Sequence, residues 1–150
     1  EAYKNYLDEM KSSPDISDLF LYGRLNYYAA TDSAYQDKQP TYLAEADTIF
    51  AQVAVKVPDN YLGNFWRARV NSLRDPETTQ GLAKPYYEAA LSILEQKPDA
   101  TKSVLVECNS YLGYYYFVKE DYNQSKQYWN KILEIDPENE TATKALGGIK

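Results

Sequence analysis

Small and apolar side chains recur along this chain in steps of four and three, and a proline followed by an acidic residue closes each run. The four prolines of this kind are 44, 40 and 39 residues apart. Steps of four and three place side chains on one face of a helix, and the proline ends that helix because it lacks an N–H group. The runs are Ala46, Phe50 and Val53 before Pro58; Tyr86, Ala90 and Ile93 before Pro98; and Ser125, Trp129 and Ile132 before Pro137. A period of this length predicts stacked helical repeats.

A second helix is expected after each proline, with a small residue near its middle. That residue is Gly23, Ala68 and Gly113 in the three successive repeats. A glycine inside a helix costs about 1 kcal/mol relative to alanine. Its recurrence predicts that two helices come very close together there. Each repeat is therefore helix A with the small residue, a turn, helix B and the closing proline.

The third repeat carries the most specific motif of the chain. It places Leu112-Gly113, Tyr116, Tyr122, Ser125, Trp129, Ile132 and Pro137 at the offsets of a tetratricopeptide repeat (TPR), with Ser125 in place of the usual alanine. The chain thus resembles TPR proteins, although Arg67 stands where leucine is expected, and Asn26 and Asn71 stand where tyrosine is usual. The resemblance implies an all-α, right-handed α-α superhelix of antiparallel helix pairs, with about eight helices.

Tyrosine-rich strings and the segment Gly81-Leu82-Ala83-Lys84-Pro85-Tyr86-Tyr87 are also similar to repeat proteins of Bacteroidetes.

The repeats divide one TPR-like domain over residues 1–150. We expect full repeats over 15–58, 59–98 and 99–137, preceded by a trailing helix B over 1–14. Residues 138–150 are either the helix A of a further repeat or a cap helix, since Leu146-Gly147 repeats the Leu-Gly offset. Loops are expected from Thr31 to Pro40 and from Asp75 to Gly81, and Asp121 with Gln124 fits a capping box.

Composition and charge exclude several classes of function. The 150 residues are 44% hydrophobic and 25% charged, which is typical of a folded domain. A net charge of −6 disfavours nucleic acid and anionic membranes, and no apolar run is long enough for direct membrane insertion. The sequence shows no signal peptide, and it leaves both a periplasmic and a cytoplasmic location open, as well as the oligomeric state.

Signatures of catalysis are absent from the sequence. There is no histidine, no phosphate-binding glycine loop and no cluster with metal-ligand spacing. We therefore predict that the chain is not an enzyme and that it holds no metal or cofactor. The acidic residues are read as solvated charges on helix surfaces, and Cys108 is read as a small core residue.

The functional candidates come from the resemblance, which implies that the A helices line a concave groove for a peptide or partner protein. Transfer by position gives Ser17, Phe20, Arg24 and Tyr27; Leu62, Phe65, Arg69 and Ser72; and Glu107, Ser110, Tyr114 and Phe117. Aromatic residues and arginine are common in binding hot spots. The expected function is a non-catalytic scaffold that binds a protein or peptide in this groove.

Structural roles compete with this interpretation. Phe20 and Phe65 could pack between A helices, and Arg24 and Arg69 could pair with acids such as Asp47 or Glu88. The carboxylate-binding positions known from chaperone-binding TPR proteins hold only one basic residue here, Arg24, so that activity is rejected.

Two other functions stay open. One is a carbohydrate-binding surface that uses tyrosines with Trp66 and Trp129, and the other, weaker one is an enzyme built from the long loop of the first repeat.

Overall fold

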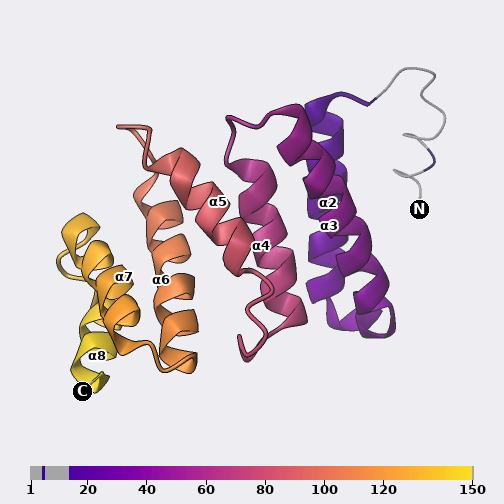
Figure 1. Ribbon diagram of the computed structural model, residues 1–150. Helices are drawn as coiled ribbons and strands as arrows, with labels where there is room; N and C mark the ends of the chain where they lie inside the picture. Colours follow the sequence, from indigo (N-terminus) through magenta and orange to yellow (C-terminus); the bar gives the residue numbers. More distant parts are fainter. Residues whose placement is uncertain (1–4, 6–13, 150) are drawn as a thin grey trace. The chain divides into compact units, whose positions relative to one another are not determined.

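The structure is a computed structural model that describes residue 5 and residues 14–149. In this part of the chain there are seven α-helices and one 3-10 helix, and no strand (Figure 1). They are α2 (Ile16–Thr31), η1 (Ser33–Lys38), α3 (Gln39–Lys56), α4 (Leu62–Arg74), α5 (Lys84–Leu94), α6 (Lys102–Val118), α7 (Tyr122–Ile135) and α8 (Glu140–Gly148). The predicted all-α, TPR-like class is confirmed. The trailing helix expected over 1–14 lies outside the described residues, except for Asn5 and Pro14.

The prolines mark helix ends as the sequence predicts. The helices α3, α5 and α7 end shortly before Pro58, Pro98 and Pro137 respectively. The residue before a proline is pushed out of the α region, so the helix cannot run through it. Pro40 and Pro85 instead lie in the first turn of α3 and α5, where an N–H group has no partner to lose.

The chain divides into two compact halves, Glu1–Arg74 and Asp75–Lys150. We call them the N-terminal half, with α2 to α4, and the C-terminal half, with α5 to α8. The division falls in the connection between α4 and α5, inside the repeat expected over 59–98. The repeat boundaries themselves stay a prediction.

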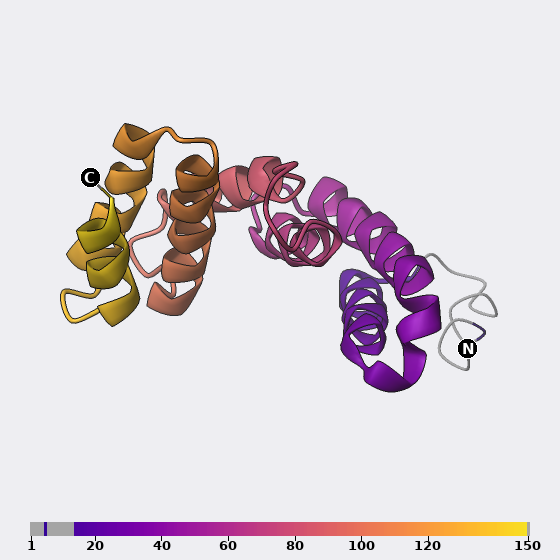
Figure 2. The ribbon, with the colours of Figure 1, turned by 90° about the horizontal axis from the view of Figure 1, so that it is seen from below.

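The core of the N-terminal half forms where α2 and α3 lie side by side (Figures 1 and 2). Phe50 of α3 is completely buried there. A Cβ atom on Gly23 of α2 would lie only 2.7 Å from Cε1 of Phe50. The glycine therefore makes room for the phenylalanine ring.

The C-terminal half repeats this arrangement with α6 and α7. A Cβ atom on Gly113 would lie 2.7 Å from Cε2 of Trp129. Beside it, the Ser125 hydroxyl donates a 2.8 Å hydrogen bond to the Gly113 carbonyl oxygen. The close approach of two helices predicted from the small residues is confirmed at Gly23 and Gly113.

The last helix, α8, packs on α7 (Figures 1 and 2). Their shared core contains Trp129, Ile132, Ala142 and Ile149, all buried. Gly147, in contrast, would have nothing within 4 Å of an added Cβ atom in the described structure. None of the helices in the described ranges is both long enough and apolar enough to cross a membrane.

The connection from α4 to α5 is organised by Asp75, which is 3% exposed. Its carboxylate accepts hydrogen bonds from the N–H groups of Gln80, Gly81 and Leu82 at 3.0, 2.7 and 3.4 Å. Burial alone would raise the pKa of Asp75, but these donors outweigh it and the pKa lies below its ordinary value. The predicted turn at Asp75 is confirmed by the bond from Thr78 N–H to the Asp75 carbonyl oxygen at 2.9 Å.

The turn from α6 to α7 is a Schellman motif. Glu120 has a φ of 60°, and its N–H group bonds to the Phe117 carbonyl oxygen at 3.0 Å. The N–H group of Asp121 bonds to the Tyr116 carbonyl oxygen at 2.9 Å. The expected capping box therefore forms only on one side, where Asp121 accepts from the Gln124 N–H group at 3.1 Å.

The expected loop from Thr31 to Pro40 is more ordered than a loop. It contains the 3-10 helix η1, which starts where the Asp32 carboxylate accepts from the Ala34 N–H group at 2.9 Å. An aspartate in this position stabilises the first turn of a helix, because its carboxylate accepts a hydrogen bond from a backbone N–H group that has no partner within the helix.

Candidate functional site

Trp66 of α4 is the centre of an aromatic cluster in the N-terminal half. Its ring stacks on Phe50 at 5.6 Å between centroids and meets Phe20 and Tyr27 edge-on at 6.0 and 5.2 Å. Tyr28 completes the cluster at 6.0 Å. Edge-on and stacked ring pairs of this kind add to the stability that burial provides. Trp66 itself is 6% exposed, so it is a core residue.

Two arginines of the predicted groove face contact this cluster. The guanidinium carbon of Arg24 lies 5.4 Å from the Trp66 ring centroid and 5.6 Å from that of Tyr28. The guanidinium carbon of Arg69 lies 4.8 Å from the Trp66 centroid and 4.5 Å from that of Phe65. All four distances are in the range of cation–π attraction. The structure thus brings Arg24 and Arg69 to the same indole.

The neighbouring groove candidates are less accessible. Phe65 is 3% exposed, and Phe20 is half-buried against Phe50 and Trp66. Tyr27 is half-buried beside Trp66, and the Ser72 hydroxyl is buried without a hydrogen-bond partner in the described structure. Packing between helices, the alternative considered for Phe20 and Phe65, accounts for both positions.

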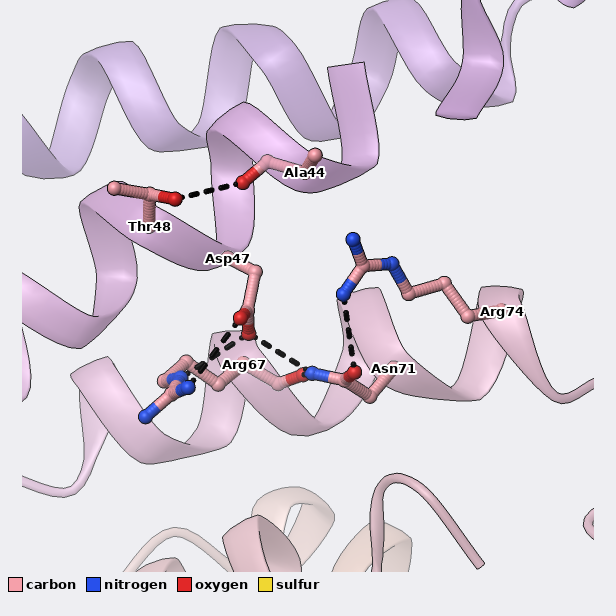
Figure 3. Close-up of polar contacts among 6 residues, drawn as sticks. All are labelled: Ala44, Asp47, Thr48, Arg67, Asn71 and Arg74. Atoms are coloured by element: carbon pink, nitrogen blue, oxygen red, sulfur yellow. Dashed lines mark hydrogen bonds and ion pairs between the residues drawn. The ribbon is translucent and has the colours of Figure 1, made fainter. Parts of the chain in front are cut away.

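Asp47 pairs with a different arginine from those considered. Arg67 holds its carboxylate with two hydrogen bonds, Nε to Oδ1 at 3.1 Å and Nη2 to Oδ2 at 3.3 Å (Figure 3). The Asn71 amide donates a third bond to Oδ1 at 2.9 Å. Glu88, the other acid considered, forms an ion pair with Lys84 at 2.7 Å.

The sequence pattern alone does not predict a functional or structural role for Arg67. The signal was its departure from the leucine expected at that position. Because Arg67 and Asp47 come from α4 and α3, the pair joins these two helices, and Asn71 from the next turn of α4 fixes its orientation (Figure 3).

In the C-terminal half, two groove candidates border an open pocket of about 230 Å³. Tyr114 and Phe117 of α6 are 44% and 42% exposed. Trp129 of α7 contributes to its wall, together with Lys144, Ala145 and Gly148 of α8 and Ile149, which directly follows α8. Of the lining side chains, only those of Tyr114, Trp129 and Lys144 carry a polar atom. The sequence predicted the α6 side of this pocket but not the α8 side.

The other two groove candidates of the C-terminal half are Glu107 and Ser110. Glu107 accepts a hydrogen bond from the Tyr87 hydroxyl at 3.0 Å, so it links α6 to α5. Ser110 is half-buried. Next to them, the rings of Tyr87 and Tyr111 lie 4.7 Å apart, and burial raises the pKa of Tyr111 to about 12.

Neither tryptophan is available for stacking on a sugar, because Trp66 and Trp129 are each 6% exposed. The carbohydrate alternative is thus not supported. Cys108 is fully buried, as expected of a core residue. Among the described residues, no three acids or cysteines are grouped in a way that could hold a metal ion.

These features define a class, the helical-repeat proteins built from antiparallel helix pairs. Within that class the chain is similar to the crystal structure of the C-terminal part of a TPR repeat-containing protein from Cytophaga hutchinsonii, a bacterium of the Bacteroidetes. The two share 30% sequence identity and a TM-score of 0.68. The similarity covers 96% of this chain and 64% of that chain.

The chain therefore has the TPR-like fold, and the resemblance to Bacteroidetes TPR proteins inferred from the sequence is confirmed. No protein-family model matches the chain, and no curated protein matches it. The TPR-like fold points in general to a scaffold for protein–protein interaction and not to an enzyme.

Proposed function

We propose that this chain is a non-catalytic scaffold that binds a segment of a partner protein at the A helices of its C-terminal half, α6 and α8. The observation that carries the proposal is the pocket beside Tyr114 and Phe117. Two aromatic side chains that are 44% and 42% exposed leave a large apolar area in contact with water. Covering that area with an apolar group from a partner is favourable because it removes apolar surface from water.

The size of the pocket supports a side chain as its occupant. Sites for small molecules have volumes of about 300–1,000 Å³. The pocket beside Phe117 is smaller, at about 230 Å³. A single leucine, methionine or phenylalanine side chain of a peptide is of suitable size. Lys144 at its border would favour an acidic residue next to that side chain.

The position of the pocket on the A helices supports the same function. Tyr114 and Phe117 are at positions that the TPR resemblance assigns to the groove face. Counted from Gly147, which repeats the Leu-Gly position of Gly113, Lys144 corresponds to Ser110 and Gly148 corresponds to Tyr114. Residues of two successive A helices therefore line one pocket.

The test is a selection from a random peptide display library, followed by affinity measurements on the selected peptides. We expect peptides with a shared apolar position, and binding weakened about tenfold or more by Phe117→Ser. Val55→Ser is the matched control, because Val55 is 81% exposed and lies on the B helix α3. Binding that is equally strong in the wild type and in Phe117→Ser would contradict the proposal, provided that circular dichroism shows both to be folded.

A further inference from the structure

We propose that the pocket beside Phe117 takes an aromatic side chain of the partner segment, with tryptophan preferred, in the place that Trp66 has in the N-terminal half. This inference rests on the proposed function and names the side chain that the partner supplies. It follows from a comparison of two sets of three helices, α2 to α4 and α6 to α8.

The two sets have the same internal order of packing. In each set the first helix packs on the second, and the second packs on the third. In each set a glycine of the first helix faces a large ring of the second. Gly23 faces Phe50 and Gly113 faces Trp129, and an added Cβ atom would lie 2.7 Å from the ring in both.

The two sets differ in the third helix. Counted from the preceding proline, Trp66 of α4 and Ala145 of α8 have the same position, and so do Arg69 of α4 and Gly148 of α8. The equivalence holds in space as well, because Ala145 packs against the core cluster that contains Trp129. The helix α8 thus lacks two large side chains that α4 carries. Ala145 and Gly148 line the pocket instead, and a Cβ atom on Gly148 would have nothing within 4 Å in the described structure.

The walls of the pocket correspond to the residues that hold Trp66. In the N-terminal half the indole stacks on Phe50 at 5.6 Å and meets Tyr27 edge-on at 5.2 Å. Trp129 has the sequence position of Phe50, Phe117 has that of Tyr27, and both line the pocket. The pocket therefore has the aromatic walls of the Trp66 site, but α8 supplies no ring between them.

Aromatic walls favour an aromatic occupant over an aliphatic one. Burial of apolar surface favours both, but only a ring gains the additional attraction of stacked and edge-on pairs. Lys144 also lines the pocket, and a cation is attracted to the face of a ring. The Trp66 site has the same combination, because the guanidinium carbon of Arg69 lies 4.8 Å from the indole centroid.

The preferred side chain has to come from another protein. The chain contains two tryptophans, Trp66 and Trp129, and each is 6% exposed. A second copy of the folded chain therefore cannot offer an indole to the pocket. The occupant is a tryptophan, or a smaller aromatic residue, in a segment of a partner protein.

The experiment repeats the peptide selection on the wild type and then exchanges the residue at the shared apolar position of a selected peptide. We expect tryptophan, phenylalanine and tyrosine together to be enriched about fivefold or more at that position. Exchange of the ring residue for leucine should weaken binding about three- to tenfold. Equal affinity of the leucine peptide would overturn the inference and leave the proposed function standing, whereas a selection without any enriched peptide would overturn the proposed function itself.

A variant of the pocket tests the same inference from the side of the protein. Ala145→Trp gives α8 the side chain that α4 carries, so a ring of the chain itself should take the pocket and weaken binding of the selected peptide about tenfold or more. Gly147→Ala is the matched control, because its added Cβ atom also has nothing within 4 Å and Gly147 does not line the pocket. Unchanged binding by a folded Ala145→Trp variant would overturn the inference. If this variant does not fold, the leucine exchange on the wild type decides.

A small probe separates a side-chain pocket from other kinds of site. The Trp129 indole N–H signal in NMR spectra of the labelled protein, assigned with Trp66→Phe, should shift with N-acetyl-tryptophan amide and much less with N-acetyl-leucine amide. Equal shifts with both would overturn the aromatic preference. Dimerisation of the wild type that Phe117→Ser abolishes would assign the pocket to a second copy and overturn the choice of partner.

Discussion

Arg67 and Asp47 form a two-point ion pair between α4 and α3, with Nε–Oδ1 and Nη2–Oδ2 distances of 3.1 and 3.3 Å. Their side chains are 22% and 20% exposed, so the pair is neither fully buried nor freely solvated. A pair of this kind stabilises a structure mainly when its geometry is fixed. Here Asn71 fixes the carboxylate.

We expect Arg67→Leu to lower the free energy of unfolding by about 1 kcal/mol, because it leaves Asp47 with only part of its bonds. A double-mutant cycle with Asp47→Asn, measured by urea unfolding, should give a coupling energy of about 1 kcal/mol. The control is the Lys144–Glu140 pair on α8, whose side chains are 78% and 83% exposed. The same coupling energy in both pairs would contradict the role given to Arg67.

We expect replacement of glycine by alanine to affect the free energy of unfolding differently at Gly113 and at Gly147. Gly113→Ala should lower the free energy of unfolding by about 1–3 kcal/mol, because the new methyl group would overlap the Trp129 ring. Gly147→Ala should leave it unchanged or raise it by about 0.5 kcal/mol, since nothing lies within 4 Å of the added atom. Thermal and urea unfolding of both variants check this. Equal effects would mean that helix propensity, and not contact with α7, decides the outcome.

Glu120 offers a route to higher stability. It adopts a φ of 60° at the end of α6, a conformation that is unfavourable for a residue with a Cβ atom. Glu120→Gly should therefore raise the free energy of unfolding by about 0.5–1 kcal/mol. Glu120→Ala is the matched control, because it also removes the charge but keeps the Cβ atom. A gain from alanine as large as that from glycine would assign the effect to charge.

Asp75 should make the stability depend on pH in the acidic range. Its pKa is lowered in the folded chain, so the unfolded chain binds the proton more tightly. The stabilisation is present above the unfolded value of about 3.9 and is lost as the pH falls through the folded value.

Asp75→Asn should cost about 1–3 kcal/mol at pH 7 and reduce the loss of stability below pH 5 relative to the wild type. Urea unfolding between pH 3 and pH 7 measures both effects. Glu77→Gln, an exposed acid in the same turn, is the control. A wild-type and an Asp75→Asn curve that fall in parallel would contradict the prediction.

The sequence was most informative about features that depend on neighbours along the chain. Helices end near Pro58, Pro98 and Pro137 because proline acts on its own backbone and on the preceding residue. The small residues Gly23 and Gly113 predicted close helix contacts, because close approach of two helices is the simplest gain that offsets the cost of a glycine inside a helix. These signals were enough to predict the fold class.

Contacts between side chains on different helices were harder to predict. The partner of Asp47 depends on which arginine of α4 points toward α3, and Arg67 does so while Arg69 lies over Phe65. The half-formed capping box has a similar cause, because the Asp121 N–H group is already bonded to the Tyr116 carbonyl oxygen in the preceding turn. The pocket beside Phe117 required α8, whose side chains were not assigned to the groove.

The fit of Gly23 against Phe50, and of Gly113 against Trp129, limits how parts of this chain can be exchanged. An α2–α3 pair or an α6–α7 pair carries both sides of its own contact, so it can be moved into another repeat array as a unit. A single helix cannot be moved in the same way. If the helix with the aromatic residue is moved alone, its ring collides with any larger residue that stands in place of the glycine. If the helix with the glycine is moved alone, the missing ring leaves a cavity beside the glycine. Recombination and design should therefore cut this protein between helix pairs.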